Sequence, residues 1–214
     1  METDNIRLKT FLIIIVTVAF IEGGAIFFSR YIHLNPMLIT CIIRLLEIIT
    51  IIKVVITWED GLTSIGLDSY TIIPGIEKGM LWAGCFGLGA GFVFFTLHFS
   101  GINPLRLIYT QLPTGKNELA LFLIVGCIIG PVAEELFFRG ILYGFFRRWG
   151  ISAALIFSTV IFIIAHHNTG TVPLTQVAGG IIFAIAYEIE KNLIVPIIIH
   201  ILGNTAIFAL SLVL

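Results

Sequence analysis

Seven apolar segments, most of them about as long as a bilayer is thick, constrain this chain more than any other feature. They run over residues 8–28, 37–57, 79–99, 118–138, 152–167, 172–189 and 192–213. A helix needs roughly 20 apolar residues to cross the hydrocarbon core, and helices satisfy their own backbone amides in lipid. The alternation of a membrane barrel is missing from the sequence. The pattern therefore predicts an all-α, polytopic membrane bundle of about seven transmembrane helices.

Composition supports a membrane protein and excludes other classes. Hydrophobic residues make up 58% of the 214 residues and charged residues 12%, about half the charged fraction of soluble domains. The net charge of −1 gives no reason to expect a nucleic-acid partner. Cys41, Cys85 and Cys127 lie in apolar runs and are expected to be free thiols. We predict a single membrane-embedded domain over residues 1–214.

Lysine and arginine near the ends of the segments predict the orientation. One side would hold Arg7, Lys9, Lys53, Lys78, Arg147, Arg148 and Lys191, and the other Arg30, Arg106 and Lys116. The positive-inside rule then predicts a multi-pass protein of the cell membrane, with its N-terminus in the cytoplasm and its C-terminus outside.

Two adjacent acids inside the fourth segment need an explanation. Glu134 and Glu135 lie in an apolar run with Arg139, where a charge costs on the order of 2.5–3.5 kcal/mol on insertion scales. Glu135 and Arg139 are four residues apart and share a helix face, whereas Glu134 is turned by about 100°. One interpretation is a structural Glu135–Arg139 pair with Glu134 as a free carboxylate. The other is a single ion cluster that serves folding.

The second segment carries its own charged pair. Arg44 and Glu47 are three residues apart, which predicts an ion pair on one helix face. Glu22 in the first segment is expected to face the bundle in a packing role, although intramembrane acids are often functional.

The third segment is rich in glycine. Small residues let helices approach closely in lipid. We therefore expect close helix packing at Gly84, Gly87, Gly89 and Gly91.

Two histidines and an amide occur in the last segments. His166 ends an apolar run, and His200 and Asn204 are four residues apart in the final segment. Buried imidazole and amide groups need partners. An interfacial histidine at position 166 and a bundling hydrogen bond at His200 and Asn204 are the plain alternatives to a functional site.

Taken together, these groups suggest a chemistry. If the segments pack together, a carboxylate and a histidine could deprotonate water. A histidine and an amide could donate hydrogen bonds to a developing oxyanion. The set fits hydrolysis of an amide bond by water. A serine or cysteine nucleophile with a base in reach is missing from the comparable positions, which makes covalent catalysis the weaker hypothesis.

The order of these motifs resembles a known family. Glu134-Glu135-x-x-x-Arg139, Phe162-x-x-x-His166 and His200-x-x-x-Asn204 are similar to three motifs of the CAAX-protease and bacteriocin-processing family of intramembrane proteases. The resemblance covers about residues 117–210. It implies that Glu134 and His166 activate water, that His200 and Asn204 stabilise the oxyanion, and that Glu135 and Arg139 support them.

The resemblance also implies a substrate class. The substrate would be a membrane-anchored protein or peptide, with the lipid bilayer as the surrounding partner. We expect a metal-free glutamic protease without a cofactor, since the zincin motif HExxH is absent. If a metal were bound, Glu134, His166 and His200 could ligate zinc. The alternative function is a non-enzymatic membrane protein, such as a bacteriocin immunity factor, a scaffold or a proton-coupled transporter.

Overall fold

The computed structural model describes residues 6–31, 34–166 and 174–213, and this part of the chain is helical and contains no strand. A helix occupies each of the seven predicted segments, which confirms the all-α prediction. Six of these helices are α1 (Leu8–Ser29), α2 (Pro36–Trp58), α3 (Ile72–Phe99), α7 (Ile151–Ala165), α8 (Leu174–Glu190) and α9 (Ile194–Ser211). The seventh is a composite helix over Lys116–Trp149.

The composite helix changes its winding along its length. It consists of α4 (Lys116–Ile124), the π-helical turn η4 (Val125–Ile129), α5 (Gly130–Glu135), the π-helical turn η5 (Leu136–Tyr143), α6 (Gly144–Phe146) and the 3-10 turn η6 (Arg147–Trp149). The prediction ended this helix at residue 138, which is too early. Arg147 pairs with Glu188 of α8 at 3.0 Å, and Arg148 donates to the carbonyl of Ile6. These contacts hold the extra turns against the bundle.

Four of the described helices are long and apolar enough to cross a membrane. They are Leu8–Ser29, Ser69–Phe99, Lys116–Trp149 and Ile194–Ser211. Large apolar side chains on their outer faces are exposed, such as Phe20, Leu88 and Phe92. An exposed apolar surface of this extent marks contact with lipid or a partner, and the protein is a helical membrane bundle.

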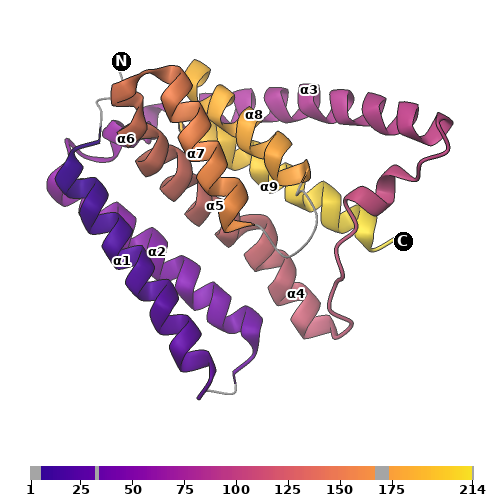
Figure 1. Ribbon diagram of the computed structural model, residues 1–214, viewed down its shortest axis with the longest axis horizontal. Coiled ribbons are helices and arrows are strands. Elements are labelled where there is room, and N and C mark those ends of the chain that lie inside the picture. Colours follow the sequence, from indigo (N-terminus) through magenta and orange to yellow (C-terminus); the bar gives the residue numbers. More distant parts are fainter. Residues whose placement is uncertain (1–5, 32–33, 167–173, 214) are drawn as a thin grey trace.

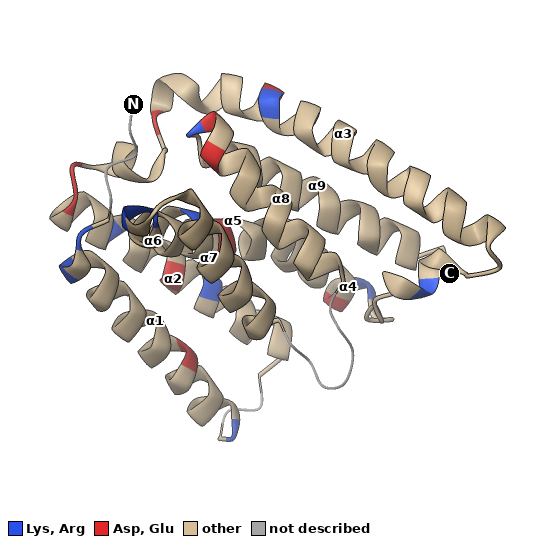
Figure 2. Ribbon diagram, turned by 45° about the horizontal axis from the view of Figure 1, so that its top comes forward, with Lys and Arg blue, Asp and Glu red and all other residues tan. Residues whose placement is uncertain are grey.

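The composite helix lies in the middle of the bundle (Figure 1). The hairpin of α1 and α2 packs against it on one side, and α7 and α9 pack against it on the other. Helix α8 lies between α7 and α9, and α3 packs along α9 at the outer edge. Figure 2 shows acidic and basic residues in the interior beside α2 and α5, while most of the outer helix α3 is uncharged. The centre of the bundle is therefore where charge is buried.

Helix α3 starts earlier than predicted and packs through different glycines. It begins at Ile72 instead of residue 79, because Pro74 falls in its first turn, where a missing N–H is tolerated. A Cβ on Gly75 or Gly79 would lie 2.6 Å or 2.7 Å from side-chain atoms of Asn192 and Ile198. The prediction of close packing at the four later glycines is wrong. A Cβ there would meet nothing within 4 Å among the described residues, and α3 and α9 separate toward their C-terminal ends (Figure 1).

We expect Gly79→Val to destabilise the protein and Gly84→Val to leave it nearly unchanged. The added Cβ at position 79 would overlap Ile198 and lie 3.1 Å from the Val195 carbonyl oxygen. Overpacking of this kind costs about 1–3 kcal/mol. The same substitution at Gly84 enters open space. Thermal unfolding of the two detergent-solubilised variants measures the difference, and equal midpoints would contradict the observed α3–α9 contact.

Candidate active site

Glu135 and Arg139 form a buried ion pair at the junction of α5 and the π-helical turn η5. Arg139 Nη1 lies 3.0 Å from Glu135 Oε1, and the two side chains are 1% and 0% exposed. This confirms the pairing predicted from their spacing. An isolated charge in such a place would be strongly unfavourable, so each group depends on the other.

Arg139 also ties neighbouring helices to the composite helix. Its Nη2 donates to the carbonyl of Gly180 in α8 at 3.1 Å. Its guanidinium carbon lies 4.7 Å from the ring centre of Phe162 and 5.1 Å from that of Phe183. Stacking on aromatic rings stabilises a guanidinium that is removed from water. Arg139 thus acts as a structural centre for α5, α7 and α8.

Glu134 is directed away from this pair and toward two histidines. Its Oε2 lies 3.3 Å from Nε2 of His166 and 3.8 Å from Nε2 of His200. The three residues come from α5, from the end of α7 and from α9. The Glu134 side chain is 18% exposed and that of His200 is 7% exposed. The structure therefore brings together the carboxylate and both imidazoles, as the sequence analysis predicted.

Both imidazole rings are oriented by hydrogen bonds at Nδ1. His166 Nδ1 lies 2.8 Å from the carbonyl oxygen of Phe162, and His200 Nδ1 lies 2.8 Å from Oε1 of Glu135. A carbonyl or a carboxylate oxygen only accepts, so Nδ1 is the donor in both rings. That leaves the two Nε2 atoms facing Glu134. Glu135 consequently orients His200 in addition to neutralising Arg139.

Aromatic rings line the same histidines. The ring of Phe183 stacks on His200 with centres 4.7 Å apart, and the rings of Phe162 and His166 are 4.3 Å apart. Such rings exclude water from one side of each imidazole and limit its rotation. The sequence analysis did not identify Phe183, because one phenylalanine among many apolar residues carries no signal of its own.

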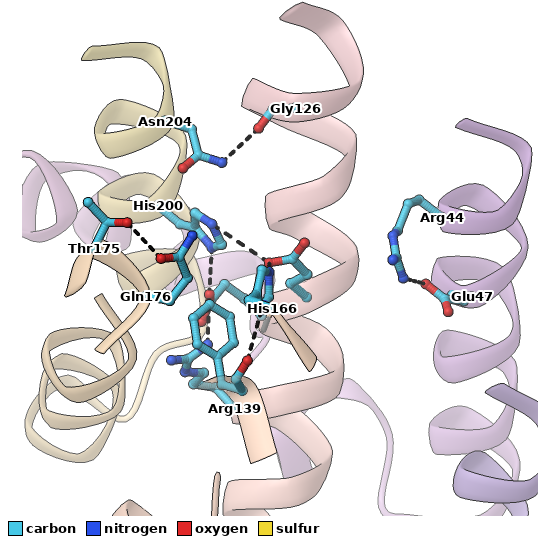
Figure 3. Close-up of polar contacts among 12 residues, drawn as sticks. Arg44, Glu47, Gly126, Arg139, His166, Thr175, Gln176, His200 and Asn204 are labelled. Carbon is cyan, nitrogen blue, oxygen red and sulfur yellow. Dashed lines mark hydrogen bonds and ion pairs between the residues drawn. The ribbon is translucent and has the colours of Figure 1, made fainter. Parts of the chain in front are cut away.

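Asn204 lies one helical turn from His200 but bonds to the backbone. Its Nδ2 donates to the carbonyl of Gly126 in η4 at 2.8 Å (Figure 3). The amide therefore stands beside the cluster and connects α9 with the composite helix. A direct contact between Asn204 and the Glu134–histidine group is absent from the described part of the structure.

A second charged group lies on α2. Arg44 Nη1 is 2.5 Å from Glu47 Oε2, which confirms the predicted pair, and 3.0 Å from Glu22 Oε1 of α1. Figure 3 shows Arg44 on the side of α2 that faces the composite helix. Glu22 thus has an ionic partner and not only a packing role. The pairing across helices could not be read from the separate segments.

The zinc alternative can be compared with these positions. Among residues 6–31, 34–166 and 174–213, no group of three or more His, Cys, Asp or Glu side chains has an arrangement suited to a metal ion. Glu134 and the two histidines lie near each other, at distances of a carboxylate in direct contact with two imidazoles.

The fold and these buried groups define a class: a helical membrane protein with a carboxylate and two imidazoles meeting inside the bundle. Residues 116–206 match the family described as Type II CAAX prenyl endopeptidase, Rce1-like. This segment, somewhat less than half of the chain, is therefore similar to the Rce1-like CAAX proteases, in agreement with the resemblance found in the motifs. All six predicted site residues lie inside the matched segment.

Two curated relatives agree with this assignment. The chain is 34% identical over 97 residues to YdiL of Bacillus subtilis strain 168, named as a candidate membrane peptidase, and this covers 45% of the chain and 39% of YdiL. It is 35% identical over 95 residues to the membrane-embedded CAAX protease MroQ of Staphylococcus aureus strain USA300, covering 41% of the chain and 38% of MroQ. The chain thus matches less than half of either relative's length. No solved structure matches it significantly.

Proposed function

We propose that this protein is an intramembrane endopeptidase that hydrolyses a peptide bond of a membrane-anchored protein or peptide. The observation that carries the proposal is the Glu134 carboxylate facing Nε2 of both His166 and His200, at 3.3 Å and 3.8 Å. Three helices would not place these groups together inside an apolar bundle for solubility or for lipid contact. The similarity of residues 116–206 to a family of CAAX proteases supports the same reaction.

The proposed reaction uses water as the nucleophile. Glu134 accepts one proton of a water molecule, whose other hydrogen is bonded to Nε2 of His166, as the water oxygen attacks the scissile carbonyl carbon. The carbonyl electrons move to oxygen. His200, protonated at both ring nitrogens, would donate to this oxyanion through Nε2–H, and Asn204 would donate through the second N–H of its amide. The carbonyl then reforms, the C–N bond breaks, and the accepted proton passes to the leaving amine. Glu135 and Arg139 keep His200 and the helices in position.

We propose the metal-free form of this mechanism. Each imidazole ring is held by a protein acceptor at Nδ1. Glu134 faces the Nε2 atom of either ring. If a zinc ion is bound instead, Glu134, His166 and His200 are the residues that would hold it, and the ion would polarise the bound water.

The orientation is part of the proposal. The distribution of lysine and arginine favours a cytoplasmic N-terminus and an outside C-terminus. Glu134 would then lie toward the cytoplasmic half of the membrane, so the cleaved bond would be reached from that side.

We expect His166→Ala to abolish cleavage, with a loss of about 10²–10⁴-fold, because a positioned acid–base group contributes that much. The purified protein would be reconstituted in vesicles with a panel of single-span peptides that carry a fluorophore and a quencher on either side of the juxtamembrane segment. Fluorescence gain reports cleavage. The wild type is expected to cleave members of this panel, and to do so equally well after treatment with a zinc chelator.

The matched control is His98→Ala, since His98 is exposed at the end of α3, far along the chain from the cluster. It should retain wild-type cleavage. Full activity of the His166 variant would overturn the proposed role. Absence of cleavage together with a proton flux that requires Glu134 would favour the transporter alternative, and loss of activity with chelator would favour a zinc enzyme.

A further inference from the structure

One side chain beside the cluster has no part in the mechanism above. Gln176 lies in the first turn of α8, ahead of a ten-residue apolar run. It was not among the predicted site residues. Its polarity in front of that run was the only sequence signal that could have drawn attention to it.

The face of α8 that carries Gln176 is the face that lines the cluster. Gln176, Gly180 and Phe183 are spaced i, i+4 and i+7 and therefore share one face. The Gly180 carbonyl accepts from Arg139 at 3.1 Å, and the Phe183 ring stacks on His200. Two turns of this face thus already contact site residues.

The packing of α7 on α8 determines which part of α7 lies opposite Gln176. A Cβ on Gly180 would lie 3.1 Å from Thr159 and 3.3 Å from Phe162. The two helices are consecutive and neighbouring, and they run in opposite directions (Figure 1). The turn of α8 that precedes Gly180 contains Gln176. It therefore lies opposite the turn of α7 that follows Phe162 and ends at His166. Figure 3 draws Gln176 on α8 in the same region of the bundle as the labelled histidines.

The carboxamide of Gln176 is held by one end only. Thr175 Oγ1 donates to Gln176 Oε1 at 2.7 Å, which fixes the oxygen and turns the NH₂ group the other way. Nε2 of Gln176 has no hydrogen-bond partner among the described residues. The Asn204 amide, by comparison, uses one of its two N–H groups for a backbone carbonyl. Gln176 therefore offers an oriented and unused donor on the α8 face that lines the cluster.

We propose that Gln176 is a substrate-binding residue whose Nε2–H donates to a backbone carbonyl of the peptide adjacent to the scissile bond. The inference rests on the proposed protease function and adds a residue to it. A peptide drawn out of its helix for cleavage exposes carbonyls that lipid cannot satisfy. An amide donor at the site would hydrogen-bond to one of these carbonyls. Because the contact is to the substrate backbone, it does not depend on the substrate side chains.

The test uses the most rapidly cleaved member of the peptide panel and the full-length protein in vesicles. Gln176→Met keeps the length of the side chain and removes the donor. We expect it to raise KM about three- to tenfold, as for loss of one neutral hydrogen bond, and to leave kcat within twofold. Gln176→Glu should raise KM further, because a carboxylate has no N–H to donate and repels the carbonyl oxygen of the substrate. Thr175→Val, which frees the amide from its orienting hydroxyl, should give a smaller rise.

Each result decides the inference. A KM within twofold of wild type for Gln176→Met overturns it. A fall in kcat at unchanged KM also overturns it, since the amide would then act only on the transition state. If Gln176→Met unfolds at a lower temperature, Thr175→Val serves as the deciding variant, and an unchanged KM there overturns the inference. Cleavage by the wild type with no effect of either variant refutes this inference alone, whereas an inactive wild type refutes the proposed function with it.

Discussion

Glu134→Gln is expected to lower kcat/KM for peptide cleavage by at least 10²–10⁴-fold while the protein remains folded. The substitution keeps the shape of the side chain and removes its ability to accept a proton, which is the contribution expected from a general base. The two Nε2 atoms that face Glu134 lose their carboxylate partner. We expect the larger share of the loss in kcat, because the base acts in the chemical step.

The same variant should not be less stable. Oε2 of Glu134 is buried and makes no aligned hydrogen bond among the described residues, although Nε2 of His166 lies 3.3 Å away. A neutral amide is less costly to bury than a carboxylate. The unfolding midpoint in detergent is therefore expected to equal or exceed that of the wild type, as often happens when a functional residue is neutralised.

Glu118→Gln is the matched control for this experiment. Glu118 lies on the composite helix too, in the first turn of α4, and is exposed. It should cleave the peptide at the wild-type rate in the same fluorescence assay. A Glu134 variant that retains more than a tenth of the wild-type kcat/KM would show that this carboxylate is not the base.

Arg139→Met is expected to have the largest effect on stability. Removing one member of a fully buried ion pair leaves the other uncompensated, which costs about 3–5 kcal/mol. Here the guanidinium also donates to the Gly180 carbonyl and contacts the Phe162 and Phe183 rings, so α7 and α8 lose an anchor as well. Thermal unfolding or titration with a denaturing detergent would measure the loss in folding free energy.

A surface pair supplies the comparison. Lys78 and Glu190 are 2.5 Å apart, but the lysine side chain is 53% exposed. Lys78→Met should therefore cost no more than about 1 kcal/mol. The double variant Glu135→Gln with Arg139→Met should regain part of the stability that Arg139→Met loses, because no buried charge is then left alone. An Arg139→Met protein as stable as the Lys78 variant would contradict a structural role for the buried pair.

The spacing of charged residues along single helices predicted two of the ion pairs inside the bundle. The four-residue interval between Glu135 and Arg139, and the three-residue interval between Arg44 and Glu47, predicted two ion pairs that the structure confirms. The helical period alone determines which side chains share a face. Pairs of this kind depend on one helix, so they can be read from the sequence.

Predictions that depended on the contact between two helices agreed less well with the structure. Gly84 and its neighbours have the small-residue pattern of a packing face, yet Gly75 and Gly79 make the close contact with α9. Which turns of α3 meet α9 depends on where the two helices cross. The sequence did not predict that the Asn204 amide also donates to the Gly126 carbonyl. Partner choice at that point depends on how near the η4 backbone comes to α9.

What the sequence by itself determined is the class of fold and the chemical groups inside it. Long apolar segments admit only helices in lipid, and charged or imidazole groups placed among them must be paired or functional. Only the tertiary structure decided that Glu134 of α5, His166 of α7 and His200 of α9 meet at one point. Helix crossing and the packing of Arg139 against α7 and α8 bring them together, and neither of these is encoded in the spacing along a single segment.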